Sequence, residues 1–284
     1  MRFTLERLRI SDASSLHELS RSIGWPMSLE DWRTNLEAGI AFGHRDEAGG
    51  LVSSSVLHVY PALEGSAQGM ASIGIVIVKS DLQRQGIGQA VIERCLEETT
   101  APVMLVSTPE GEGLYQKLGF QEIERVQNLV APQGVRLPVE NHQTIKESDF
   151  GKILGFDRHI FGADREKLLR IRWKQATGGA LLPGRDLFDW PRGFGWKIRQ
   201  EDRLILGPVV APDTAGALQL VGNLAAGHEG LIRLDVPDRQ TEFIAQLVEA
   251  GFERRALRPL MLRGGEHLPG DRDRLFAVAA LACG

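Results

Sequence analysis

The chain has 284 residues, of which 43% are hydrophobic and 25% are charged, and its formal net charge is −4 at pH 7. These proportions are typical of a globular protein with a core large enough for two domains, and they exclude a disordered or fibrous chain. The slightly acidic balance argues against a protein that coats nucleic acid, and no apolar run in the sequence reaches the ~20 residues that span a membrane.

The cysteine content and the start of the chain indicate a compartment. Cys95 and Cys283 are the only two cysteines, too few for a disulfide framework or, by themselves, for a metal cluster. Residues 1–10 carry charge but no apolar segment of the kind found in secretory leaders. We therefore expect a protein of the reducing cytoplasm that holds no metal and does not bind a membrane.

The first sixty residues alternate between strand and helix patterns. Ser11 and Asp12 can cap one helix, and Ser28 can cap a second, which has Glu30 and Asp31 in its first turn. Glycines close the turn between the last two strands. The expected elements are a strand over residues 3–10, helices over 11–20 and from 28, and strands over 40–44 and 51–60.

The stretch from residue 71 to 98 combines a strand, a glycine turn and a helix. The run 73–78 is apolar and β-branched, Gly86 and Gly88 mark the turn, and apolar residues with helical spacing follow from Ala90. Glycines at a helix start leave its first N–H groups open to a ligand, and those groups suit a phosphate. The spacing excludes both the GxxxxGK[ST] loop and the GxGxxG fingerprint.

A second motif follows the next expected strand, over residues 103–107. The sequence LYQKLGF, residues 114–120, predicts a short amphipathic helix that ends at Gly119, after which Phe120 enters the core. The two motifs therefore come in a fixed order with one strand between them.

These two segments resemble the GNAT superfamily of acyl-CoA-dependent N-acyltransferases. Residues 83–88, QRQGIG, match its [QR]xxGx[GA] segment, and residues 114–120 are similar to its [LF]YxxxGF segment. The resemblance implies an α/β (α+β) fold with a mixed, mostly antiparallel sheet, acetyl-CoA as co-substrate, and a pantetheine arm beside a splayed strand. The cofactor-binding residues it implies are Ile75, Val76, Ile77, Val78, Gln83, Arg84, Gln85, Gly86, Ile87, Gly88 and Gln89, together with Thr108, where many relatives have asparagine.

Tyr115 is the candidate acid that protonates the departing thiolate. A phenol with a pKa near ~10 is protonated at neutral pH and lies only about 1.5 units from a thiol near ~8.5. The alternative is a tyrosine that only packs a helix on the sheet. The resemblance places the oxyanion at a backbone N–H of residues 75–78.

The sequence does not single out a base or an acceptor site. His58, Glu64, Asp31 and Glu37 are possible proton acceptors, and each is more often a structural or solvated residue. Trp25 and Trp32 are candidate walls of the amine pocket, or else buried wedges between helices.

The second half repeats several short sequence motifs of the first half at separations of about 132 to 137 residues. No glycine pair follows Asp213, however, so we expect that this unit does not bind CoA. The chain resembles a bacterial tandem-GNAT subgroup in which a catalytic unit precedes a degenerate one. It predicts a catalytic domain over 1–131, a linker over 132–141 and a degenerate domain over 142–284. We expect Asp164 and Arg165 to pair structurally, and the charge run of residues 170, 172 and 174 to be solvated.

Together these features predict an acetyl-CoA-dependent N-acetyltransferase that acts by direct attack of a primary amine in a ternary complex. Neither cysteine sits in a nucleophile motif, which disfavours an acyl-enzyme. The alternative is a non-catalytic acyl-CoA-binding sensor or scaffold. The expected partner is a small-molecule or peptide amine, with no nucleic acid, and the chain is expected to be a monomer or a homodimer.

Overall fold

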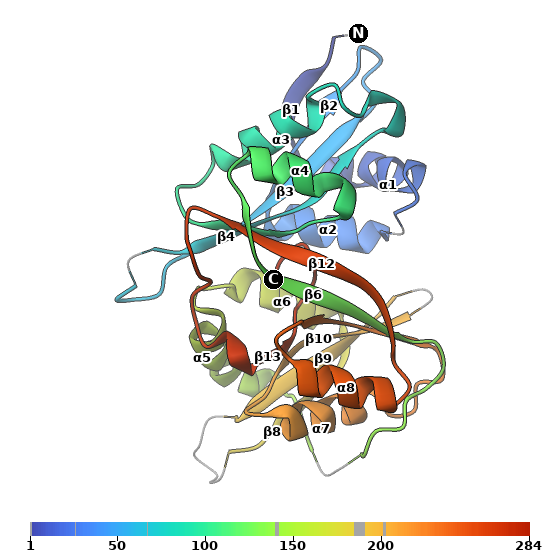
Figure 1. Cartoon of the computed structure of the whole chain (residues 1–284), viewed down its shortest axis with the longest axis vertical. Helices are drawn as coiled ribbons and strands as arrows, with labels where there is room; N and C mark the ends of the chain where they lie inside the picture. Colours follow the sequence, from blue (N-terminus) through green and yellow to red (C-terminus); the bar gives the residue numbers. More distant parts are fainter. Residues whose placement is uncertain (1, 26, 67, 140–141, 185–190, 201–202) are drawn as a thin grey trace.

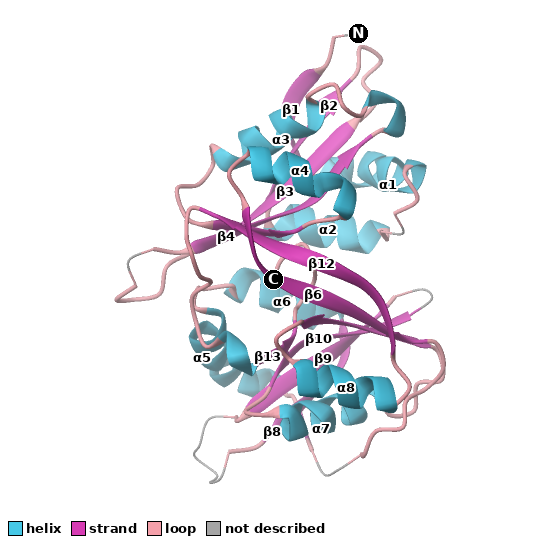
Figure 2. Ribbon diagram, viewed as in Figure 1, coloured by secondary structure: helices cyan, strands magenta, loops and turns pink. Residues whose placement is uncertain are grey.

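The computed structural model describes residues 2–25, 27–66, 68–139, 142–184, 191–200 and 203–284. Figure 1 shows two lobes, one from each half of the chain, and Figure 2 shows that strands run through the middle of the molecule from one lobe to the other. None of the described helices is both long and apolar enough to cross a membrane.

The first half contains six strands and four α-helices within the described residues. They are β1 (Thr4–Leu8), α1 (Ala13–Ser22), α2 (Leu29–Ala38), β2 (Ile40–Arg45), β3 (Ser53–Tyr60), β4 (Met70–Val78), α3 (Ile87–Leu96), β5 (Val103–Val106), α4 (Pro109–Lys117) and β6 (Gln121–Ala131). This is the predicted order of elements.

The second half repeats the pattern with a short first strand and one extra strand at its end. Its elements are β7 (Gln143–Thr144), α5 (Phe150–Phe161), α6 (Glu166–Gln175), β8 (Ala176–Leu182), β9 (Gly193–Arg199), β10 (Arg203–Val210), α7 (Thr214–Ala225), β11 (Leu231–Pro237), α8 (Thr241–Glu249), β12 (Glu253–Arg263) and β13 (Leu275–Ala277).

Local signals placed several boundaries correctly. Ser28 caps α2 as predicted, because its hydroxyl accepts a hydrogen bond from the N–H of Asp31 at 3.0 Å. Several strand boundaries differ from the prediction, and β1 covers only Thr4–Leu8 of the predicted residues 3–10. β4 begins at Met70, three residues before the β-branched run, and β3 begins at Ser53, because Leu51 forms only an isolated bridge with Arg45.

The two halves share one continuous sheet and do not form two separate ones. Its strand order is β1-β2-β3-β4-β5-β12-β6-β11-β10-β9-β8-β7. β12 comes from the second half but pairs with β5 of the first, and β6 comes from the first half but pairs with β11 of the second. Each half therefore gives its long strand, β6 or β12, to the other half.

This exchange bears on the predicted division into residues 1–131, 132–141 and 142–284. The division remains a prediction about the sequence, and strand pairing crosses it in both directions. Residues 140 and 141 of the predicted linker lie outside the described residues.

Helices cover both faces of the first-half sheet. On one face α3 and α4 bury Val91, Ile92 and Tyr115 against strand residues that include Ile73. On the other face α1 and α2 pack against a cluster that includes Ile77. The site discussed below lies between these two layers.

Candidate cofactor and active site

β4 and β5 are parallel neighbours that separate along their length. They pair at only two positions, Ala71 with Val103 and Ser72 with Met104, and no further pairing between them is found in the described residues. Beyond Ser72 the edge of β4 that faces β5 is open. The splay implied by the resemblance is therefore present, and an extended ligand could pair with this edge as an added strand.

A β-bulge lies in β4 where the two strands part. The pairing with β3 shifts register between Ser54 and Val56, opposite Ile75. Ile75 has φ of 55°, in the left-handed region that a β-branched residue rarely adopts, and its carbonyl accepts a hydrogen bond from Ser54 Oγ at 3.2 Å. A bulge changes where backbone amides point, so this is a suitable place for the expected oxyanion donor.

The glycine turn opens onto the start of α3 as the sequence predicted. Gly86 is the N-cap with φ of 83°, which favours glycine, and α3 begins at Ile87. The N–H of Ala90 donates to the carbonyl of Gly86 at 3.0 Å, so the N–H groups of the three preceding residues lack acceptors within the helix. The loop is exposed, and an anion can reach these groups.

The glutamine side chains near the turn have local partners. Gln83 donates to the carbonyl of Val78 at 3.3 Å, and Gln89 donates to Glu93 at 2.8 Å. Arg84 has φ of 63° and is exposed. These side chains therefore shape the turn, while its backbone N–H groups face the position where we expect the pyrophosphate.

Replacing Gly88 by valine is expected to weaken CoA binding. An added Cβ at Gly88 would lie 3.5 Å from Val78 of β4 and 3.5 Å from Leu114 of α4, so the side chain would fill the gap between β4 and α4. We expect about a 30-fold rise in the Kd for CoA, equivalent to about 2 kcal/mol of binding free energy, because the valine methyl groups would occupy space at the expected cofactor site. Titration calorimetry measures this change.

Gly151→Val is the matched control, because Gly151 is a helical glycine of α5 with no atom within 4 Å of an added Cβ. Neither glycine has positive φ, so both proteins should fold. An unchanged Kd in a folded Gly88→Val protein would contradict the cofactor site described above.

Tyr115 is buried beneath the point where β4 and β5 diverge. Its ring is 8% exposed, packs edge to face against Phe120, and shares a cluster with Ile73 of β4 and Leu105 of β5. None of the described residues is a hydrogen-bond partner of its hydroxyl. The phenol is therefore well placed for a ligand lying between the two strands, and its catalytic role remains a prediction.

The pKa of Tyr115 is not matched to that of a thiol as closely as the sequence suggested. Burial raises the pKa of Tyr115 to about 12, whereas a free thiol has a pKa near ~8.5. The difference between the pKa of Tyr115 and that of a free thiol is therefore larger than the reference values suggested. A phenol of this kind stays protonated at neutral pH and can stabilise a thiolate by donating a hydrogen bond.

Thr108 follows the end of β5 and is the N-cap residue of α4, although its side chain makes no capping hydrogen bond. Its backbone is extended, and its carbonyl accepts hydrogen bonds from Ser107 Oγ at 2.7 Å and from the N–H of Gly111 at 3.0 Å. A hydrogen bond from Thr108 also helps to lower the pKa of Glu110, after that from the Glu110 N–H. Contact between Thr108 and the cofactor remains a prediction.

Trp32 and Trp25, the two predicted walls of the amine pocket, differ in their burial. Trp32 is 0% exposed, and its Nε1 donates to Ser20 Oγ at 3.2 Å, so it joins α1 to α2. A direct substrate contact by Trp32 is therefore wrong for this conformation, because no face of its ring reaches solvent. Trp25 is half-buried against the same cluster, and its role as a pocket wall stays a prediction.

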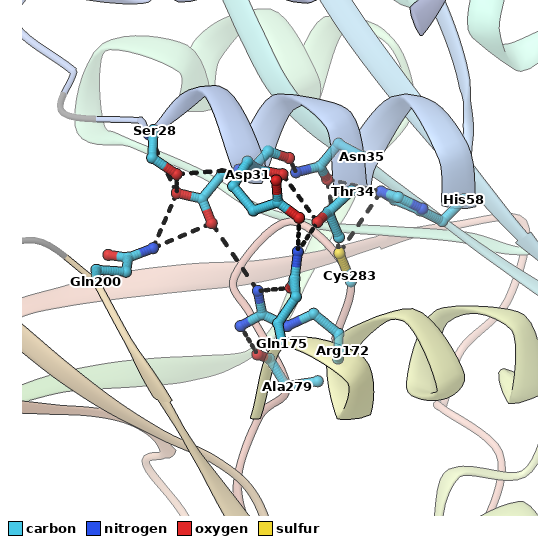
Figure 3. Close-up of polar contacts among 11 residues, drawn as sticks. Ser28, Asp31, Thr34, Asn35, His58, Arg172, Gln175, Gln200, Ala279 and Cys283 are labelled. Atoms are coloured by element: carbon cyan, nitrogen blue, oxygen red, sulfur yellow. Dashed lines mark hydrogen bonds and ion pairs between the residues drawn. The ribbon is translucent and has the colours of Figure 1, made fainter. Parts of the chain in front are cut away.

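The structure brings His58 together with Asn35 and Cys283, which the sequence did not suggest. His58 Nε2 lies 3.1 Å from Asn35 Oδ1 and 3.5 Å from Cys283 Sγ (Figure 3). Burial lowers the pKa of His58 to about 4 and raises that of Cys283 to about 11. At neutral pH these groups are a neutral imidazole and a thiol, so neither is a strong base or a nucleophile.

The charge run on α6 was predicted to be solvated, and for Arg172 this is wrong. Arg172 is 5% exposed, and burial lowers its pKa. Its Nη1 lies 3.9 Å from Asp31 Oδ1, and its Nη2 donates to the carbonyl of Ala279 at 3.4 Å (Figure 3). The side chain is buried because the two lobes meet there, a contact that α6 periodicity alone does not reveal.

Asp164 and Arg165 were expected to pair, but each has a different ion-pair partner. Arg165 is buried and makes two hydrogen bonds to the carboxylate of Asp157, at 2.7 and 2.8 Å. Asp164 instead accepts a hydrogen bond from Arg158 at 2.9 Å.

The helix start in the second half that corresponds to α3 is already occupied. The carboxylate of Asp213 accepts a hydrogen bond from the N–H of Gly216 at 2.8 Å and caps α7. A second anion at this position would be repelled, which supports the prediction that this unit does not bind CoA. Across the described ranges, no group of three or more His, Cys, Asp or Glu residues could hold a metal ion.

Comparisons with known proteins agree with this geometry. Two family models, both described as acetyltransferase (GNAT) domain, match residues 45–122 and 153–277. The chain is 28% identical over 287 residues to the uncharacterized N-acetyltransferase YitH of Bacillus subtilis (strain 168), covering 99% of this chain and 98% of the relative.

Solved structures share the fold of the whole chain. A putative acetyltransferase from Pyrococcus horikoshii superposes with a TM-score of 0.80 at 20% identity, covering 99% of this chain and 96% of that one. A tandem GNAT protein from the clavulanic acid biosynthesis pathway gives a TM-score of 0.65 at 15% identity, covering 93% and 99%. At these identities the likeness is one of fold.

Proposed function

The chain belongs to the GNAT superfamily and carries two of its acetyltransferase domains in tandem, and from this premise we propose that the first domain acetylates a primary amine. The acetyl donor is acetyl-CoA, and the amine attacks directly in a ternary complex. The splay of β4 from β5, which leads to the uncapped start of α3, is the observation that carries this proposal.

The proposed reaction uses the backbone more than side chains. The amine nitrogen bonds to the thioester carbonyl carbon, and the negative charge that develops on the carbonyl oxygen is stabilised by a backbone N–H of residues 75–78. The carbon–sulfur bond then breaks, and Tyr115 donates a hydrogen bond or its proton to the departing thiolate. The proton lost by the amine passes to water, directly or through a side chain.

A pH profile follows from the burial of Tyr115. Its pKa is raised to about 12, so the phenol keeps its proton until the pH approaches that value. We expect kcat/KM to rise with pH as the acceptor amine loses its proton, with no decline below about pH 10. Steady-state rates from pH 6 to 10 check this. A decline centred near pH 9 that disappears in Tyr115→Phe would contradict it.

The test of the proposed function is thiol release from acetyl-CoA with a panel of amines. The panel should include short alkylamines, polyamines, amino acids, aminoglycosides and lysine peptides, because the fold does not fix the acceptor. Amine-dependent thiol release with a matching acetylated product supports the proposal. CoA binding without turnover across the panel would instead support an acyl-CoA sensor or scaffold.

A further inference from the structure

In the second lobe, a segment of the chain occupies the groove that corresponds to the proposed cofactor groove. β10 and β11 run parallel and pair from Arg203 to Ile205 only, and beyond this β13 pairs with β10, Val209 opposite Ala277. The N–H of Val278 donates to the carbonyl of Asp235 in β11 at 3.0 Å. β13 thus bonds to both splayed strands, as a pantetheine arm would in the first lobe.

The chain then leaves this groove and crosses to the first lobe. We name residues 279–284 the crossing segment. Besides Arg172, which donates to the carbonyl of Ala279, three buried side chains donate hydrogen bonds to its carbonyls. They are Ser72 Oγ to Ala282 at 2.9 Å, Tyr60 Oη to Cys283 at 2.7 Å and Arg165 Nη1 to Gly284 at 2.8 Å. These bonds come from both halves of the chain and hold the backbone of the crossing segment in one position.

The crossing segment packs directly on β4 beside the bulge. A Cβ added to Gly74 would lie 2.5 Å from the Cβ of Ala282, so the two residues are in close contact. Ala282 also packs against the cluster that contains Ile75 and Ile77. The crossing segment therefore covers the α2 side of β4, as Figure 3 shows for Cys283 below α2.

The position of the crossing segment on the α2 side of β4 determines what the acceptor amine meets. The glycine turn and Tyr115 lie with α3 and α4, so the cofactor occupies that side of the splay. An amine that attacks the thioester carbonyl has to come from the side that the cofactor leaves open, which is the α2 side. On that side lie Gly74 and the crossing segment, to which the buried Ser72 is hydrogen-bonded.

We propose that the crossing segment forms one wall of the acceptor site and that Ala282 limits the size of the acceptor next to its nitrogen. The proposal rests on the proposed function. The preferred substrate class is a primary amine with an unbranched CH2 group beside the nitrogen, because close packing between Gly74 and Ala282 leaves no room for a branch. The second lobe thus contributes a specificity-determining residue, although its own groove is filled.

The test places a thiol at the proposed wall and delivers an electrophile through the cofactor. In Ala282→Cys, bromoacetyl-CoA should alkylate the introduced thiol, whose sulfur displaces bromide from the CH2 group and whose proton passes to water. Ala256→Cys is the matched control, because Ala256, like Ala282, is a partly buried alanine but lies on β12, away from the crossing segment. Peptide mass spectrometry measures both adducts, and CoA binding is measured separately by calorimetry.

We expect alkylation at position 282 to be at least tenfold faster than at position 256. Equal rates in proteins that bind CoA would overturn the acceptor wall and leave the proposed function standing. Failure of the wild-type chain to bind CoA would overturn both. Because Ala282→Cys could disturb packing, Ala282→Gly provides a second measurement. It should raise kcat/KM for an α-branched amine relative to its unbranched isomer by about tenfold, and an unchanged ratio would overturn the proposal.

Discussion

Replacing Tyr115 by phenylalanine is expected to lower kcat by on the order of 10²-fold or more, with little change in the Kd for acetyl-CoA. The substitution removes only the hydroxyl, so the edge-to-face packing on Phe120 and the helix that carries it remain. Thiolate departure then lacks its hydrogen-bond donor. Steady-state kinetics give kcat, and calorimetry with CoA gives the affinity.

Tyr60→Phe is the control for folding alone, because Tyr60 is the other tyrosine of the chain and is also buried, and its hydroxyl bonds to the crossing segment. It loses a hydrogen bond to the carbonyl of Cys283, which should cost about 1 kcal/mol of folding free energy without altering the α4 side of the splay. If Tyr115→Phe kept the wild-type kcat, Tyr115 would be a packing residue, and the proton would have to come from solvent.

A fragment of residues 1–131 is expected not to fold by itself. Within the whole chain β5 pairs with β12, from Val103 with Arg263 to Val106 with Leu260, and β6 pairs with β11 along six positions. The fragment contains neither partner, so two strands of the central sheet would expose their backbone groups and apolar faces. Circular dichroism should show no cooperative thermal transition, and CoA should not bind.

Adding a fragment of residues 132–284 provides the control. It contains both missing strands, and co-expression should restore a folded complex that binds CoA. The competing outcome is that β6 folds back onto β5 within the first fragment. A monomeric fragment that unfolds cooperatively and binds CoA would show this, and β12 would then be dispensable.

Short-range patterns were sufficient for most elements of the first half. The cap at Ser28, the positive φ of Gly86 and the α4 helix before Phe120 all follow from interactions within a few residues. Backbone geometry and capping are local, so single-sequence reasoning can predict them. The proposed cofactor site could be predicted from the sequence for the same reason, since its glycine turn is one contiguous motif.

Features that depend on distant segments could not be predicted in this way. Arg172 lies on a helix whose sequence resembles a solvated face, and it is buried only because the lobes meet there. The contact between Gly74 and Ala282 joins residues from opposite ends of the chain, and small residues carry no recognisable signal. From the sequence, Trp32 could be either a wall of the amine pocket or a buried wedge between helices. Its burial between α1 and α2 favours the wedge.

The exchange of β6 and β12 makes neither lobe the product of one contiguous stretch of coding sequence. A recombination event that moved only one half of the gene would separate β5 from its partner β12 and β6 from its partner β11. Either half therefore needs the other to complete its sheet. If the second half binds no CoA, as we expect, it would still supply β12 as the neighbour of β5 in the first half.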